Sequence, residues 1–247
     1  MSDIPQRPQS ISLARALGWW LQGVWFWKSA PLRVAFWSLL PLAFEALLQA
    51  LPVVGIVASK LIVPLVGGLS LLAFDRIVRR QAVDVSELLS DLRRLGPAGL
   101  AGLVIAGFAV FLLQLVTGYV AYGPGAIDLL LWGDTAAHPD LLADKQIFLT
   151  LVLVALAVGM LLLFFAPLVV LHRLHPAAAL SLSATTMLAA PAALIVTYVL
   201  SALLFAAALT WGYGLGLLLL VPLLSAVYFM AYRDVFVAPA ADRTAAA

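Results

Sequence analysis

The chain has 247 residues, of which 64% are hydrophobic and 11% are charged, and its formal net charge is +2. A soluble domain has about 45–50% apolar and about 25% charged residues, so these charged side chains are too few to cover a soluble core. The composition therefore excludes soluble folds and predicts an integral membrane protein. Because the chain has no Cys, a disulfide framework, a thiolate metal site and a cysteine nucleophile are also excluded.

Residues 1–10 are polar and lack an apolar core, so we expect an N-terminal tail without a cleaved signal peptide. In residues 11–28, leucines recur at helical spacing and four Trp lie among them. Indole rings prefer the headgroup level of a bilayer, which favours an amphipathic helix in the interface. A longer first span is the alternative, but Lys28, Pro31 and Arg33 interrupt the apolar run.

Two further short segments, 84–95 and 176–190, have the same character. Asp84 is a suitable N-cap for the first, and Pro176 suits the first turn of the second. Like the first segment, each is followed by a membrane hairpin. We therefore expect three interfacial helices on one side of the membrane.

Six stretches are apolar and long enough to cross a hydrocarbon core about 30 Å thick as helices. Continuous apolar runs exclude a barrel, whose strands alternate. The six stretches are Val34 to Ala50, Val54 to Phe74, Ala98 to Ala121, Ile147 to Leu171, Ala192 to Leu209 and Gly214 to Tyr232.

The distribution of basic residues predicts the orientation. Twelve of the 14 Lys and Arg residues fall on one side of these spans, Lys145 falls on the other, and Lys60 lies inside a span. By the positive-inside rule both termini are cytoplasmic and the loop 122–146 is external. We expect a multi-pass protein of the bacterial cytoplasmic (inner) membrane.

The first and third hairpins share a spacing. Pro64 lies 11 residues before Asp75, and Pro222 lies 11 residues before Arg233. Both hairpins begin and end on the cytoplasmic side, so we interpret them as parallel repeats; chance is the alternative, since Pro and Leu are abundant. The expected fold is all-α, with one transmembrane domain over 11–236 and a disordered tail over 237–247.

The chain contains the run FAPLVVLH at 165–172, a polar helix with Ser181 and Ser183, and a segment 228–236 that includes Tyr232-Arg233-Asp234. These features resemble a YciC-like group of six-span proteobacterial inner-membrane proteins. They are more distantly similar to the membrane domain of some glycerophosphodiester phosphodiesterases. The resemblance covers most of the chain and implies six helices, without an established activity.

Two charged residues lie inside predicted spans, where ionisable groups are costly and are functional candidates. Glu45 lies seven residues before Pro52 and Lys60 lies eight after it, so an antiparallel hairpin places them at similar depth. The pair could line a hydrophilic path. Alternatively it is a structural ion pair, or the side chains snorkel to the external interface.

A second group of candidates gathers at the cytoplasmic ends of the second and sixth spans. This charge cluster consists of Asp75, Arg76, Tyr232, Arg233 and Asp234. If the hairpins are parallel copies, Asp75 can face Arg233 and Arg76 can face Asp234. We expect Asp75 and Arg233 to form the better pair; the alternative is that each side chain extends into water.

Several arginines adjoin the second span and the second interfacial helix, a placement that suits anionic lipid headgroups. The same charges also serve membrane topology. These headgroup candidates are Arg76, Arg79, Arg80, Arg93 and Arg94. His172 and His175 are interpreted as a solvated pair, and no metal site or cofactor motif is recognised.

The leading hypothesis for function is a membrane-organising or lipid-interacting protein that is not an enzyme. Its expected partners are membrane lipids, anionic ones included, and not nucleic acid. The alternative is a small transporter with Glu45 and Lys60 along an intramembrane path. A cavity that reaches the midplane and is lined by Glu45 or Lys60 would favour transport, and a packed midplane would favour the organising role.

Overall fold

The computed structural model describes residues 11–51, 54–132, 137–138, 140–141, 145–210 and 215–237. The predicted tail 1–10, the predicted tail 237–247 except Val237, and part of the predicted external loop lie outside these residues. Within them all the regular secondary structure is helical. The elements are α1 (Leu13–Ser29), α2 (Pro31–Gln49), α3 (Val54–Val78), α4 (Val85–Arg93), α5 (Gly96–Tyr122), α6 (Pro124–Ile127), η1 (Asp128–Trp132), α8 (Lys145–Leu161), α9 (Phe165–Leu171), α10 (Pro176–Leu188), α11 (Pro191–Thr210), α12 (Gly216–Tyr232) and η2 (Arg233–Val237).

Five helices in the described residues are long and apolar enough to cross a membrane: α2, α3, α5, α11 and the combined α12–η2 helix. Helices α8 and α9 add a sixth if the bent pair counts as one span. The chain therefore has the helices of an all-α, multi-pass membrane protein. Their outer surfaces agree with this, because Leu32 on α2 is 84% exposed and Val120 on α5 is 77% exposed.

The fourth predicted span is broken. A continuous apolar run predicts one helix from Ile147 to Leu171, but α8 and α9 meet at an angle of 50°. Ser183 of α10 occupies the break: its hydroxyl accepts a hydrogen bond from the Phe164 N–H at 3.1 Å and donates one to the Leu161 carbonyl at 2.8 Å. A side chain inserted into the helical ladder is a recognised cause of a kink.

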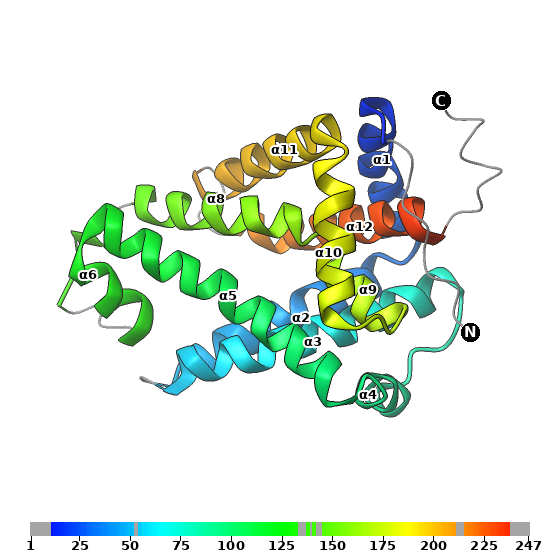
Figure 1. Cartoon of the computed structure of the whole chain (residues 1–247), viewed down its shortest axis with the longest axis horizontal. Helices are drawn as coiled ribbons and strands as arrows, with labels where there is room; N and C mark the ends of the chain where they lie inside the picture. The colour runs from blue at the N-terminus through cyan, green and yellow to red at the C-terminus, as the bar shows by residue number, and fades with distance from the viewer. Residues whose placement is uncertain are drawn as a thin grey trace.

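Three short helices form over the segments expected to be interfacial. In Figure 1, α1 and α10 cross the long helices steeply, and α4 is seen nearly end-on at the end of the bundle near α9. Helix α1 is separated from α2 by Ala30, whose backbone is not helical (φ −150°, ψ 64°). The alternative of one long first span is therefore wrong.

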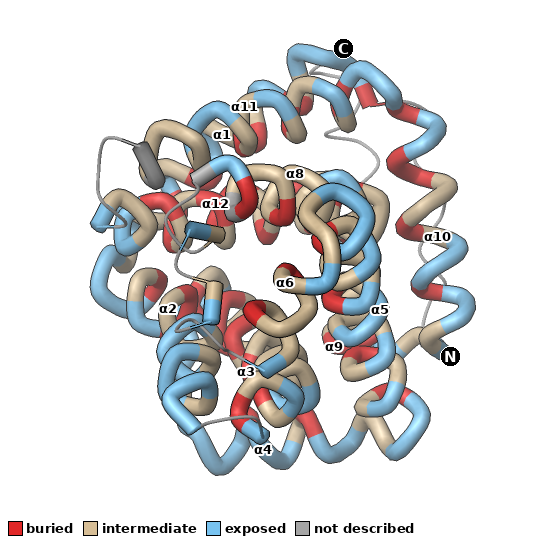
Figure 2. Tube along the Cα trace, turned by 90° about the vertical axis from the view of Figure 1, so that its left-hand side faces the viewer, coloured by how far each residue is buried: buried red, intermediate tan, exposed pale blue. Residues whose placement is uncertain are grey.

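Helix α1 packs tightly on α12. A Cβ atom at Gly23 would lie 2.6 Å from Val227 Cγ2 and 2.8 Å from the Val227 backbone, so only glycine permits this approach. Trp19, one turn before, is fully buried and contacts the ring of Phe164 edge-on. Figure 2 shows the buried residues on the inward faces of the helices and the exposed ones outside.

Candidate functional site

A cavity of about 680 Å³ lies between the long helices. Residues of α2, α3, α5, α8, α9, α11 and α12 line it, and most of them are apolar. We call it the interhelical cavity. Volumes of about 300–1,000 Å³ are usual for sites that bind small molecules.

Small residues and prolines leave this volume unfilled. Gly67 of α3 and Gly159 of α8 line the cavity, and a Cβ atom at either would meet no atom within 4 Å. Gly107 of α5 has a different role, because its missing side chain lets the ring of Pro64 approach. Pro41 and Pro64 both lie in the wall and leave less side-chain volume than the leucines around them.

A few polar groups line the otherwise apolar wall. Gln114 Nε2 donates to the Leu151 carbonyl at 3.3 Å, and the Tyr228 hydroxyl donates to Ser201 Oγ at 2.8 Å. Ser38 is 5% exposed, and its hydroxyl has no hydrogen-bond partner within the described part of the chain. Buried polar groups are normally paired, so the Ser38 hydroxyl is available to a bound molecule.

Glu45 and Lys60 form the pair that their positions around the first hairpin turn predict. Lys60 Nζ donates to Glu45 Oε1, which also accepts from Gln49 Nε2 at 3.1 Å. Lys60 Nζ lies 5.2 Å from the centroid of the Phe111 ring. Neither residue is among those that line the interhelical cavity.

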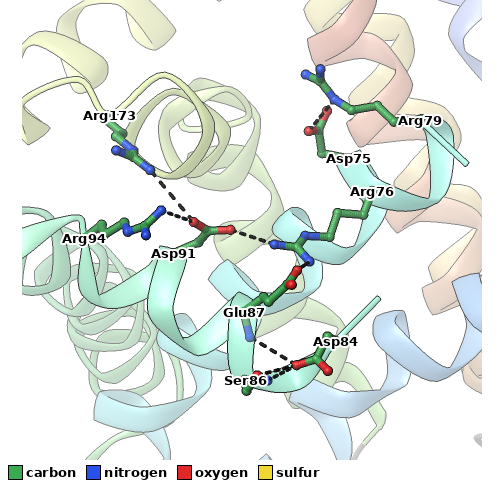
Figure 3. Close-up of polar contacts among 9 residues, drawn as sticks. All are labelled: Asp75, Arg76, Arg79, Asp84, Ser86, Glu87, Asp91, Arg94 and Arg173. Atoms are coloured by element: carbon green, nitrogen blue, oxygen red, sulfur yellow. Dashed lines mark hydrogen bonds and ion pairs between the residues drawn. The ribbon is translucent and has the colours of Figure 1, made fainter. Parts of the chain in front are cut away.

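Arginines and carboxylates from three segments meet at the end of the bundle, as Figure 3 shows. Arg76 of α3 donates to Glu87 of α4 and, at 2.9 Å, to Asp91 of α4. Asp91 also accepts from Arg94 at 3.3 Å and lies 4.0 Å from Arg173, which follows α9. We call these five residues the arginine–carboxylate cluster; it joins α3, α4 and the segment after α9.

The expected ion pairs between the second and sixth spans are absent from the described residues. Asp75 instead pairs with Arg79, one turn later on α3, at 2.7 Å. Asp234 pairs with Arg15 of α1 at 2.6 Å and accepts from Trp19 Nε1 at 2.9 Å. Arg233 and Asp75 attract each other electrostatically but are too far apart to form an ion pair. The predictions of Asp75 with Arg233 and of Arg76 with Asp234 are therefore wrong.

The physical reason is the availability of closer partners. A residue four positions along the same helix needs no long-range arrangement to meet Asp75. Arg15 and Trp19 reach Asp234 because the close approach at Gly23 holds α1 against α12. Asp84, Glu87 and Asp91 recur at helical spacing on α4, a signal that could have identified α4 as the acidic partner of Arg76.

The five headgroup candidates have different environments. Arg76, Arg79 and Arg94 are engaged by carboxylates. Arg80 and Arg93 form no ion pair in the residues that the structure describes. Only these two of the five have an uncompensated charge.

His172 is not the solvated side chain that the sequence suggests. Its Nε2 is buried without a hydrogen-bond partner in the described segments, and its ring lies 5.8 Å from that of Tyr232, which is 2% exposed. Burial lowers the pKa of His172 below its usual 6.5. His175 caps α10, since its Nδ1 accepts from the Ala177 N–H at 3.4 Å. No group of three or more metal-ligating side chains occurs among the described residues.

Comparison of the chain with protein-family models, with curated proteins and with solved structures finds no match. The resemblance to the YciC-like group stays a prediction.

Proposed function

We propose that this chain is a lipid-interacting membrane protein whose helical bundle accommodates the apolar part of a membrane amphiphile. The interhelical cavity carries the proposal. It has a volume of about 680 Å³ and a mostly apolar wall, and glycines rather than large side chains border part of it. An acyl or isoprenoid chain would gain about 25 cal/mol for each Å² of apolar surface that it buries there.

The proposed topology has six spans, with α8 and α9 as one broken span, and both termini in the cytoplasm of a bacterial cell. The ion pair between Arg15 and Asp234 supports this, because it holds the start of α1 beside the end of α12 on one side of the bundle. Helices α1, α4 and α10 would then lie in the inner leaflet interface. The hairpins α2–α3 and α11–α12 are the proposed parallel repeats.

The proposed role is binding without catalysis. Glu87 and Asp91, the carboxylates of the arginine–carboxylate cluster, neutralise arginines and do not line the cavity. The transport alternative has weaker support, since Glu45 and Lys60 are paired with each other away from the cavity wall. The cavity also means that the bundle is not fully packed between its long helices, which favours lipid binding over a purely organising role.

Filling the cavity tests the proposal. Gly67→Leu and Gly159→Leu place side chains into open space and should abolish co-purification of lipid, measured by native mass spectrometry of the full chain in detergent. Gly18→Leu on α1 is the matched control, because its Cβ would meet only Gln22 Nε2 at 3.9 Å. All three variants should elute as monodisperse protein. Equal lipid content in the three variants and the parent chain would contradict a cavity-bound lipid.

A further inference from the structure

A second hollow, of about 670 Å³, lies between α1, the start of α2, the end of α3 and α12. Its polar rim consists of Gln22, Ser29, Arg33 and Arg80, beside the indole of Trp25. Its floor is apolar and includes Phe26 and Met230. We call it the basic groove.

The charge of the groove is positive and uncompensated. Arg33 and Arg80 form no ion pair within the described residues, unlike Arg76, Arg79 and Arg94 nearby. No acidic residue lines the groove. Lys28 adds a further positive charge, because its Nζ lies 5.6 Å from the centroid of the Trp25 ring. Guanidinium groups bind phosphate oxygens through paired N–H donors, so this rim is complementary to a phosphate.

The end of α3 determines the position of Arg80. Arg80 has φ 56°, a left-handed conformation, at the position that follows α3. Its N–H donates to the Ile77 carbonyl at 3.0 Å and the Gln81 N–H donates to the Arg76 carbonyl at 2.9 Å, the pattern of a Schellman helix end. Glycine is the usual residue there, so the arginine side chain is present at a cost in backbone strain.

A cluster of packed aromatic rings separates the floor of the groove from the interhelical cavity. Phe26 contacts Phe74 and Phe229, with ring centroids 5.8 and 5.6 Å apart, and these two rings line the cavity. The groove therefore combines a phosphate-complementary rim with an apolar base next to the proposed lipid site. Trp25, 70% exposed, has the amphipathic character typical of residues at the headgroup level.

We propose that the basic groove binds the phosphate-bearing headgroup of an anionic membrane phospholipid. Arg33 and Arg80 are the phosphate ligands, and Gln22 and Trp25 offer further N–H donors to the headgroup. This inference rests on the proposed function for the membrane setting, and it names the class of lipid. Two converging cations favour a headgroup with net negative charge over a zwitterionic one, whose ammonium group would meet the same positive field.

Lipid titration of the full chain in detergent, followed by native mass spectrometry, tests the inference. Phosphatidylglycerol should bind more tightly than phosphatidylcholine. The double variant R33Q/R80Q should weaken phosphatidylglycerol binding by about tenfold or more and remove the preference. R173Q is the matched control, because Arg173 is 54% exposed, lies beside Asp91 and does not line the groove.

The variant R80G separates binding from folding. Glycine suits the left-handed backbone at this position, so R80G should unfold at the same or a higher temperature while losing affinity for phosphatidylglycerol. Unchanged affinity in both R80G and R33Q/R80Q would overturn the inference. Displacement of the phospholipid by millimolar inorganic phosphate would also overturn it, because the groove would then be a site for free anions.

The cavity variants distinguish this inference from the proposed function. If Gly67→Leu and Gly159→Leu remove lipid but R33Q/R80Q retains the preference for phosphatidylglycerol, the headgroup site is wrong and the cavity proposal stands. If R33Q/R80Q abolishes phosphatidylglycerol binding but the cavity variants do not, the cavity proposal is wrong and the groove binds a lipid whose chains lie outside the bundle.

Discussion

Ser70 of α3 donates a hydrogen bond to the backbone carbonyl of Trp37 in α2 at 2.6 Å. Pro41 lies four residues after Trp37 and has no N–H, so it cannot satisfy that carbonyl within α2. A hydroxyl from the neighbouring helix takes the place of the missing donor. Such replacement is what allows proline inside a membrane helix.

Replacing Ser70 with Ala should lower the free energy of unfolding by about 1–3 kcal/mol, because the Trp37 carbonyl then stays buried without this donor. Thermal unfolding in detergent measures the change. Ser59→Ala is the matched control on the same helix: Ser59 is fully buried, but its hydroxyl donates to Ile56 within α3. A loss in S59A as large as that in S70A would contradict the special role of Ser70.

Asp234→Asn should weaken the docking of α1. The Asp234 carboxylate accepts from Arg15 and from the buried indole of Trp19, so its loss should cost about 1–3 kcal/mol. Hydrogen exchange of α1 amides, followed by mass spectrometry, measures the docking. Asp75→Asn is the control, since Arg79 is 58% exposed and an exposed pair contributes only about 0–1 kcal/mol. Equal exchange of α1 in the two variants would refute the assignment.

Asp91→Asn should release α4 from the end of α3. Asp91 pairs with Arg76 and Arg94 and lies near Arg173, so its neutralisation removes the counter-charge of Arg94 and Arg173 and leaves Arg76 with Glu87 alone. Tryptic cleavage after Arg93 and Arg94 should accelerate by about tenfold, because local opening becomes more frequent. Glu87→Gln should have a smaller effect, as Glu87 is 63% exposed and serves one arginine. Equal acceleration in both variants would be inconsistent with Asp91 as the centre of the cluster.

Acid should destabilise the bundle through His172. Burial lowers the pKa of His172 in the folded chain below its usual 6.5, so the folded state favours the neutral ring. The contribution of His172 to the free energy of unfolding is therefore complete at a pH above the usual pKa of 6.5. It is lost as the pH falls through the lower pKa that His172 has in the folded chain. His172→Gln cannot titrate, and its unfolding temperature should fall less between about pH 7 and about pH 5. Parallel pH profiles for the two proteins would exclude this contribution.

Alkaline phosphatase fused after Ala137 should be active, because we expect this position on the external side of the membrane. Green fluorescent protein fused after Arg80 should fluoresce, because we expect that position in the cytoplasm. The excess of arginine at the end of α3 is the physical reason. Paired alkaline phosphatase and green fluorescent protein fusions measure both sides. Reversed signals at the two positions would overturn the proposed topology.

The pairing of Glu45 with Lys60 was predictable from the sequence, because a short turn alone determines which residues of one hairpin face each other. The pair of Asp75 with Arg79 was also within reach of the sequence, because the two residues are four positions apart on one helix. Whether Asp75 meets Arg233 instead depends on the relative rotation of two helices distant in sequence, and the sequence does not determine that rotation. The sequence did not identify Arg15 and Trp19 as the partners of Asp234, because an interfacial amphipathic helix at 11–28 does not by itself indicate which span it packs against.

The helix positions followed from apolar length, but the break between α8 and α9 did not. The Ser183 hydroxyl of α10 fills the break, and an apolar run contains no sign of a side chain that approaches from elsewhere. Pro167, which has no N–H for the Leu163 carbonyl four residues before it, is the sequence feature that could have indicated the break. The interhelical cavity was equally hidden. A glycine such as Gly67 can mark close packing or open space, and only the neighbouring helices determine which.

The contact between Arg15 and Asp234 joins residues 219 positions apart, so the N-terminal helix is synthesised long before its docking surface exists. At about 5–20 residues per second, translation separates the two side chains by roughly 10–45 s. During that time Arg15 and Trp19 lack the carboxylate that they share in the finished protein. The seating of α1 on α12 is consequently a closing step of assembly, which can occur only after the last span has been inserted.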